Sequence, residues 1–297
     1  MPDTFPVQST LTPTSAQSGL LRLSQGHLNL LETCPRKFQH VFLEQLGSPT
    51  SPEQQERQTW GSRFHLLMQQ RELGLPIEAL IQQDVQLQRW LTAFIQAAPD
   101  VLTLDTDGRS SLIRQSEHRR TLNFTTTEAQ PKQNYLLTVV YDLLILDQQQ
   151  AQILDWKTYP RPQDARWLAQ DWQTRLYPYV LAETSDYLPE QISMTYWFVQ
   201  GQQNESAVMP EPQSLRFPYS EALHAQTQQD LHCLLDQLTT WLQRYQSGEP
   251  FPQVNPAAGS CQACQFAIRC DRTSPEAEST SPDDWLSAIA TIQEVPL

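Results

Sequence analysis

Two apolar segments with a short polar break between them, residues 134–146 and 151–158, constrain the fold of this chain more than any other feature. Both are rich in β-branched and aliphatic residues, so they are predicted to pair as an antiparallel hairpin. A turn centred between Gln148 and Gln149 places Asp142 opposite Asp155, and loops of two or four residues give the same register. Opposed side chains in such a hairpin have Cβ atoms about 4.5–5.5 Å apart. The sequence therefore predicts two carboxylates side by side in otherwise apolar strands.

Two like charges at opposed positions destabilise a sheet unless a positive group lies between them. A divalent cation such as Mg²⁺, which binds one or two carboxylates and several waters, is the simplest such group. Strand alternation puts Lys157 on the same face as Asp155 and Trp156 on the other face. The alternative is that both aspartates end their strands at a solvated edge, with Lys157 as a surface partner. The metal site is favoured because Lys157 is one of only three lysines in the chain.

The rest of the chain alternates between helical and strand patterns. The apolar periodicity predicts helices at about residues 24–46, 53–73, 77–97, 164–184 and 219–247, with a break after Cys34 imposed by Pro35. Further strands are predicted at 111–125 and 190–201. This order predicts an α/β fold with a mixed central sheet flanked by helices. Residues 21–272 are expected to form one domain with a helical insertion at about 73–107, between a flexible tail at 1–20 and an acidic tail at 273–297.

The hairpin and its D-x-K motif resemble the core of the PD-(D/E)XK nuclease superfamily, in its RecB-like branch. Family members also carry a metal-binding histidine on an upstream helix, and His65 in Gly61-Ser-Arg-Phe-His65 matches it. The helix after D-x-K carries Q-x-x-x-Y in the family, which Gln173 and Tyr177 match. The opening Cys-Pro-Arg-Lys-Phe segment is matched at 34–38, and the likeness spans about residues 22–272. The chain departs from the family at Val139, where a glycine often stands.

The resemblance implies a restriction-endonuclease-like core and a metal-dependent deoxyribonuclease that acts on single-stranded DNA ends. In that interpretation Mg²⁺ or Mn²⁺ is held by His65, Asp142, Asp155 and the main-chain carbonyl of Trp156. Lys157 would orient the attacking water or stabilise the phosphate in the transition state. Gln173 and Tyr177 would support the site or contact the strand being cut. Glu117, in the predicted strand at 111–125, is a weaker candidate for the rim of the site.

The cysteines near the C-terminus form a second constellation. Cys261, Cys264 and Cys270 have the spacing C-x₂-C-x₅-C, so a four-coordinate site needs one more ligand. Cys34, at the break before Pro35, is favoured over Cys233, which lies among the leucines of a predicted helix. RecB-like relatives with one early and three late cysteines bind a [4Fe–4S] cluster. The resemblance thus implies a cluster that joins the N- and C-terminal segments, with Zn²⁺ as the alternative.

Charge limits what the chain binds. The formal net charge is −13, and about −7 of it lies in residues 21–270, which argues against a nonspecific polyanion binder with a basic surface. The same acidity favours a second hypothesis, a noncatalytic nucleic-acid-binding or scaffold subunit of a repair or recombination complex. The sequence shows no secretory signal and no apolar run of 18 residues, so a cytoplasmic protein without a membrane partner is expected. It shows no P-loop, so unwinding of DNA would need a helicase or another repair or CRISPR protein as partner.

Overall fold

The computed structural model describes residues 20–47, 52–82, 84–98, 112–162, 166–200, 212–262 and 264–272. The two predicted tails, apart from Leu20, lie outside these ranges, as does the end of the predicted insertion beyond residue 98. No helix within the described ranges is both long enough and apolar enough to cross a membrane.

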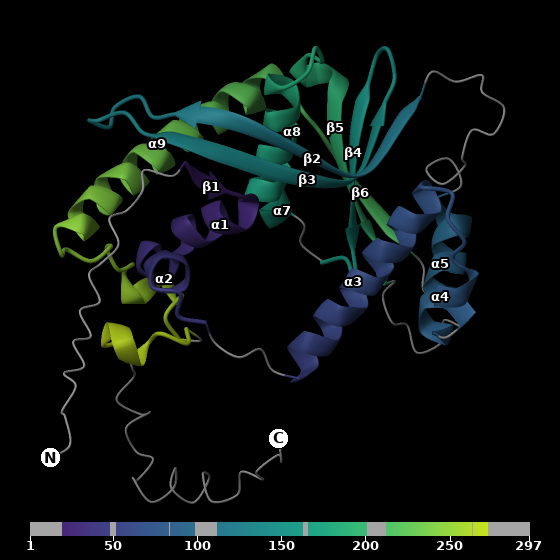
Figure 1. Ribbon diagram of the computed structural model, residues 1–297, viewed down its shortest axis with the longest axis horizontal. Coiled ribbons are helices and arrows are strands. Elements are labelled where there is room, and N and C mark those ends of the chain that lie inside the picture. The colour runs from purple at the N-terminus through teal and green to yellow at the C-terminus, as the bar shows by residue number, and fades with distance from the viewer. Residues whose placement is uncertain are drawn as a thin grey trace, which may run out of the picture.

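A six-stranded mixed sheet forms the centre of the molecule (Figure 1). Its strands run in the spatial order β1–β3–β4–β5–β6, and β2 pairs with β3 as well. The pairs β1–β3 and β4–β5 are parallel, and the other pairs are antiparallel. The strand bounds are β1 Leu21–Leu23, β2 Ile113–Thr125, β3 Asn134–Leu146, β4 Ala151–Lys157, β5 Ile192–Phe198 and β6 Gln213–Pro218. The prediction of an α/β fold with a mixed sheet is confirmed.

The hairpin of β3 and β4 has the predicted register. Leu143 pairs with Leu154 and Leu146 with Ala151, so Asp142 and Asp155 are the next two residues along the ladder. The turn is held by Asp147, whose carboxylate accepts hydrogen bonds from the backbone N–H groups of Gln149 and Gln150. The turn position inferred from the sequence is therefore correct. A slip of one residue would have moved every buried side chain to the other face.

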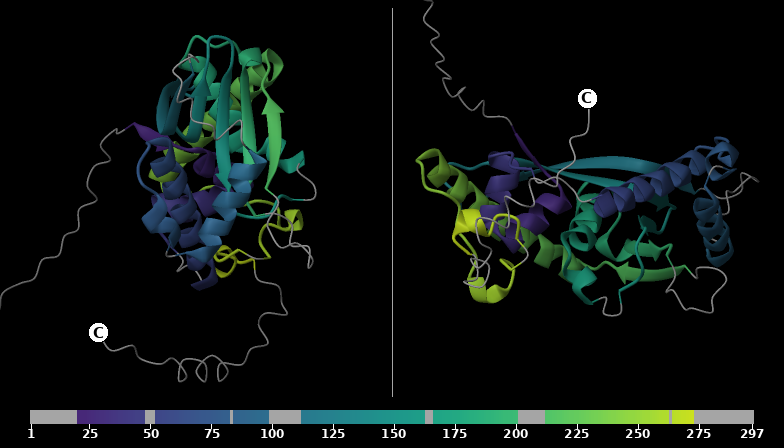
Figure 2. Two further views of the ribbon diagram at one scale, coloured as in Figure 1. Left: turned by 90° about the vertical axis from the view of Figure 1, so that its right-hand side faces the viewer. Right: turned by 90° about the horizontal axis from the view of Figure 1, so that it is seen from below.

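Two hydrophobic cores cover the two faces of the sheet. The larger core contains Ile153 of β4 and buries side chains of α1 (Gln25–Thr33), α8 (Trp172–Glu183) and α9 (Glu221–Gln246). The smaller core contains Leu154 and Trp156 of the same strand, with side chains of α3 (Pro52–Glu72) and α5 (Val85–Ala97). Figures 1 and 2 show α3 and α5 at one end of the molecule. At the other end, α1 and α2 (Pro35–Phe38) lie beside the C-terminal segment formed by residues 251–262 and 264–272.

The alternation of side chains between the two faces of β3 is interrupted at Asp142. Val139 and Tyr141 pack in the larger core, yet Leu143, which the same alternation would place beside them, packs in the smaller core. Opposite Asp142, the register of β2 places Glu117 between the paired residues Ser116 and His118, and Glu117 itself has a left-handed backbone with φ of 50°. A bulky residue in this region is strained by about 1–3 kcal/mol. Glu117 and Asp142 therefore interrupt the regular pairing of β2 with β3.

The structure divides two predicted helices at capping aspartates. The segment predicted at 77–97 forms α4 (Glu78–Gln82) and α5, and the carboxylate of Asp84 accepts from the N–H groups of Gln86 and Leu87. The segment predicted at 164–184 forms α7 (Arg166–Gln170) and α8, capped by Asp171. Aspartate at an N-cap satisfies backbone donors that a new helix leaves free. Strand β1 was not predicted because it has only three residues and pairs with β3, more than a hundred residues away. Strand β6 was not predicted, although it pairs with the preceding strand, because none of its side chains is fully buried.

Candidate active site

Asp142 lies where the β3–β4 ladder ends. The residue is buried, with 8% of its surface exposed, and its Oδ2 accepts a hydrogen bond of 2.7 Å from the backbone N–H of Trp156. The carboxylate therefore takes the place of a ladder hydrogen bond on β4. Its other oxygen, Oδ1, faces His65, with 3.3 Å between Oδ1 and Nδ1.

His65 reaches the sheet from α3 because that helix comes close to the end of β4. A Cβ atom on Gly61, one turn earlier, would lie 3.1 Å from Oγ1 of Thr158, so only glycine permits this approach without a shift. The imidazole contacts Asp142 through Nδ1 and the carbonyl oxygen of Trp156 through Nε2, at 3.1 Å. Burial by itself lowers the pKa of His65, but the hydrogen bond to Asp142 and the charges of Asp142, Asp155 and Glu117 outweigh it and raise this pKa to about 9.

Glu117 completes the group. Its Oε1 lies 3.9 Å from Nδ1 of His65, and one ligand atom each of His65, Glu117 and Asp142 lie within 4.8 Å of one another. Within the described ranges this is the only such group of three His, Cys, Asp or Glu side chains. Burial and the charge of Asp142 raise the pKa of Glu117 despite the attraction of His65. The acidic groups thus repel one another, and a cation between them would relieve that repulsion.

Asp155 faces a different set of partners. Its Oδ1 lies 2.6 Å from Nζ of Lys157, and its Oδ2 accepts a 2.5 Å hydrogen bond from Nε2 of Gln173. Lys157 in turn donates to Oε1 of Gln173 at 2.6 Å. Burial favours the neutral amine, but the adjacent Asp155 carboxylate outweighs it and raises the pKa of Lys157. The ammonium, carboxylate and amide therefore form a closed ring beside the group of His65, Glu117 and Asp142.

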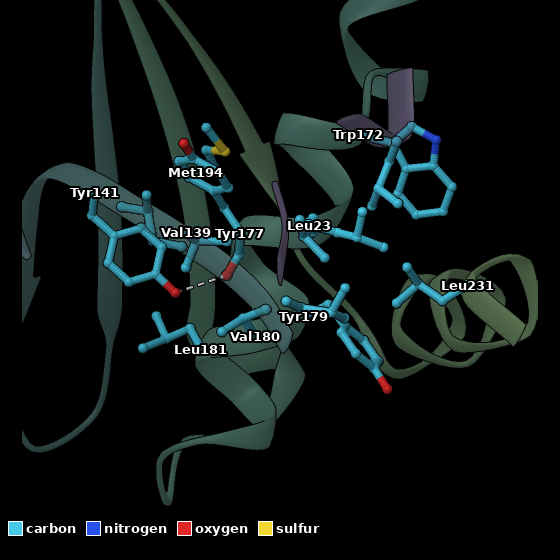
Figure 3. Packing of buried hydrophobic residues seen from close by; sticks show 14 of the residues in the cluster. Leu23, Val139, Tyr141, Trp172, Tyr177, Tyr179, Val180, Leu181, Met194 and Leu231 are labelled. Atoms are coloured by element: carbon cyan, nitrogen blue, oxygen red, sulfur yellow. Dashed lines mark hydrogen bonds between the residues drawn. The ribbon is translucent and has the colours of Figure 1, made fainter. Parts of the chain in front are cut away.

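Tyr177 lies beneath this ring and not at the surface. The residue is 4% exposed, and its backbone carbonyl accepts a 3.0 Å hydrogen bond from the hydroxyl of Tyr141 (Figure 3). Burial raises the pKa of the Tyr177 hydroxyl, with the charges of Asp155 and Asp142 as further causes. The Tyr177 side chain is therefore buried next to Gln173, one turn earlier on α8.

The four cysteines expected to act together line one cavity of about 40 Å³, namely Cys34, Cys261, Cys264 and Cys270. All four are half-buried, whereas Cys233 is exposed on α9 and does not line this cavity. The N-terminal side is tied to the C-terminal segment by Arg36, whose backbone N–H donates to the carbonyl of Pro252 and whose Nε donates to that of Phe251. The cavity therefore joins segments more than two hundred residues apart in sequence.

Comparison with known protein families assigns the chain. The model of the PD-(D/E)XK nuclease superfamily matches residues 22–271, which include strands β2 to β6, all of β1 except Leu21, and both sets of candidate ligands. The chain belongs to the PD-(D/E)XK nuclease superfamily. A search of curated proteins gave no match.

Two solved structures resemble this superfamily member in part. A candidate exonuclease from Eubacterium rectale is 11% identical, with a TM-score of 0.49 over 98% of this chain and 100% of that chain. The protein SSO0001 is 10% identical, with a TM-score of 0.37 over 85% of this chain and 87% of that chain.

In the structure, Glu117 lies closer to the centre of the candidate metal site than the sequence predicted. Sequence analysis paired Asp142 with Asp155 and left Glu117 at the rim, yet Glu117 shares the closest group of ligand atoms with Asp142 and His65. The register of β2 against β3 puts Glu117 opposite Asp142, but the polar connection of eight residues between these strands does not fix that register. The one available signal was a lone glutamate inside a predicted strand.

Proposed function

We propose that this chain is a RecB-like, metal-dependent deoxyribonuclease that degrades single-stranded DNA ends. The observation that carries the proposal is the convergence of His65, Glu117 and Asp142 beside the Asp155–Lys157 pair, in a chain of the PD-(D/E)XK nuclease superfamily. Three ligand side chains with repelling carboxylates fit a hard divalent cation. A positively charged lysine next to such a site fits the stabilisation of a scissile phosphate.

The candidate ligands fit Mg²⁺ or Mn²⁺ through carboxylate oxygens and one imidazole nitrogen. The carbonyl oxygen of Trp156, also expected as a ligand, contacts Nε2 of His65 on the other side of the ring from Asp142 and Glu117. When bound there, the cation would polarise the phosphate and lower the pKa of a water molecule. Asp155 and Gln173 hold the ammonium of Lys157 in place, so that it can donate a hydrogen bond to the attacking water or to a phosphate oxygen. Oδ1 of Asp155 contacts the ammonium of Lys157, and a carboxylate oxygen with one such partner retains a lone pair for a cation.

An exposed aromatic ring next to the site supports a single-stranded substrate. Tyr159, two residues after Lys157, is 42% exposed, and its ring packs edge-on against Phe198 with 5.8 Å between centroids. The charges of Lys157 and Asp155 both act on its hydroxyl, so the ring lies beside the reacting groups. Unpaired bases stack on aromatic side chains at about 1–3 kcal/mol per base, a contact that a paired duplex withholds.

The cavity of the four cysteines supports a [4Fe–4S] cluster over zinc. All four cysteines line the same cavity, and one early cysteine with three late ones is the arrangement of RecB-like relatives that bind this cluster. A cluster there would stabilise the fold by closing a loop of more than two hundred residues.

The test of the nuclease function compares end-labelled single strands with duplexes of the same sequence, with Mn²⁺, with Mg²⁺ and with EDTA. Wild-type protein is expected to degrade the single strand in the presence of either cation and to be inactive with EDTA. The variants Asp142→Asn and Lys157→Ala are expected to lose activity by at least about a hundredfold, as for loss of a general acid–base or electrostatic group. Lys132→Ala, which removes an exposed lysine, is the matched control. Metal-dependent cleavage that persists in both site variants would contradict the proposal.

A separate measurement tests the cluster. Protein purified without oxygen is expected to be brown and to contain about four iron and four sulfide per chain. The variant Cys34→Ser is expected to lose the colour, whereas Cys233→Ser is expected to keep it. Colourless protein that contains zinc would refute the iron–sulfur assignment and leave the nuclease assignment standing.

A further inference from the structure

A buried histidine lies behind one of the four cysteines. His40 is 3% exposed, and its Nε2 lies 3.7 Å from Sγ of Cys270. Its Nδ1 lies 2.6 Å from a carboxylate oxygen of Glu44, and its ring packs against Phe266 with 4.9 Å between centroids. His40 itself does not line the cavity, so it approaches Cys270 from the protein side.

The helix geometry holds this histidine in place. Residues Gln39–Leu43 form a π-helical turn, η1, with a backbone hydrogen bond from Glu44 to the carbonyl of Gln39. The wider turn brings residues i and i+5 together, so Gln39 donates to one oxygen of Glu44 at 2.5 Å while His40 contacts the other. Gln39 is also fixed from behind, because its Oε1 accepts from the backbone N–H of Phe251 at 2.7 Å. Glu44, locked on both oxygens, therefore fixes the orientation of the imidazole.

We propose that His40 is a positioning residue for Cys270, with both ring nitrogens protonated: Nδ1 donates to the carboxylate of Glu44, and Nε2 donates a hydrogen bond to the sulfur of that ligand. The inference rests on the proposed four-cysteine centre. Its chain of contacts runs from the backbone of Phe251 through Gln39, Glu44 and His40 to the sulfur. Partners behind a metal ligand set its orientation and its electron density, and their loss typically costs about 10–100-fold in metal affinity.

A hydrogen bond to a ligand sulfur stabilises the more negative, reduced form of a cluster, and burial of the sulfur shields it from solvent. His40 lies between the carboxylate of Glu44 and the Cys270 sulfur, and a guanidinium nitrogen of Arg269 lies 3.8 Å from Glu44 Oε2. The expected effect of removing the donor is therefore a lower reduction potential and faster loss of the cluster. A tenfold change in the ratio of oxidised to reduced cluster corresponds to about 59 mV for a one-electron couple.

The test uses full-length protein purified without oxygen, in wild-type form and as His40→Phe, Glu44→Gln and His27→Phe. Phenylalanine at position 40 keeps the ring contact with Phe266 but has no N–H group. The control His27→Phe removes a half-buried histidine of the same region, whose Nδ1 contacts Ser24 and not a cysteine. The readouts are the midpoint potential from a redox titration followed by visible absorbance, and the rate at which a chelator removes iron.

His40→Phe is expected to lower the potential by about 59 mV and to lose iron about tenfold faster, with His27→Phe unchanged. Glu44→Gln is expected to shift both readouts in the same direction by a smaller amount. If His40→Phe fails to fold, the Glu44→Gln variant decides by the same readouts. Wild-type potential and wild-type iron loss in the variants would overturn the role of His40. Wild-type protein without iron and sulfide would instead refute the cluster itself, so the two failures are distinguishable.

Discussion

The strongest electrostatic prediction concerns His65 in the metal-free protein. The folded structure raises the pKa of His65 from 6.5 to about 9, because the attraction of Asp142, Asp155 and Glu117 outweighs the cost of burial. A raised pKa means that the folded state binds the proton more tightly than the unfolded state. The resulting stabilisation is fully present below pH 6.5 and is lost as the pH rises to about 9 and above.

The size follows from the pKa difference. A difference of about 2.5 pKa units corresponds to about 3.4 kcal/mol at 1.36 kcal/mol per unit. The side chain of His65 is 32% exposed, and solvent screening reduces the value to about 2 kcal/mol. The variant His65→Gln removes the titrating group while keeping a polar side chain that can donate to the carbonyl of Trp156. The free energy of unfolding that His65→Gln loses relative to wild type should therefore be larger at pH 6 than at pH 9.5, by about 2 kcal/mol.

The assay is urea unfolding with EDTA at pH 6 and pH 9.5, followed by circular dichroism. The quantity compared is the change in the free energy of unfolding between the two pH values, because groups away from His65 titrate alike in both proteins. His224→Gln, which removes a histidine that contacts Glu183 far from the site, is the matched control. Parallel losses of stability in wild type and His65→Gln between these pH values would refute the electrostatic reasoning.

Three further predictions follow from the same contacts. Mn²⁺ binding at pH 7.5 should release roughly one proton per ion, because His65 becomes neutral when it binds the cation. Calorimetry in buffers of different ionisation enthalpy measures this release, and a value near zero would contradict the role of His65 as a ligand. Gln173→Ala should lower the single-turnover cleavage rate at saturating Mn²⁺ at least about tenfold, or about 1.4 kcal/mol, because Gln173 orients Lys157, and it should also weaken Mn²⁺ binding, because Gln173 donates to Asp155. An unchanged rate at saturating Mn²⁺ would exclude this function. Phe94→Ala should reduce the free energy of unfolding by about 3–5 kcal/mol in urea titrations, because Phe94 is fully buried between Trp156 and Trp197, and a loss below about 1 kcal/mol would show that the smaller core collapses around the gap.

The sequence was sufficient where the pattern is local. The hairpin register followed from strand periodicity and a short turn, and the break at Pro35 follows from the missing N–H and the ring of proline. The helices that divide at Asp84 and Asp171 also carried a local signal, since aspartate is a preferred N-cap, but the apolar stripe ran through both positions. Strand β1 had no comparable signal, because three residues are too few for a pattern and its partner β3 is distant in sequence. Strand β6 had none because no side chain in it is fully buried.

The sequence by itself determined the acidic hairpin, its neighbouring lysine and the chemical types of the candidate ligands. Only the tertiary structure decided which of them meet. The interruption of the β2–β3 pairing at Glu117 and Asp142 brings the two carboxylates close together, and the close approach of α3 at Gly61 brings His65 to both. These contacts depend on the pairing of β2 with β3 and on the packing of a helix more than seventy residues upstream of β4. Long-range packing of this kind is set by the whole core and leaves no periodic signal in any single segment.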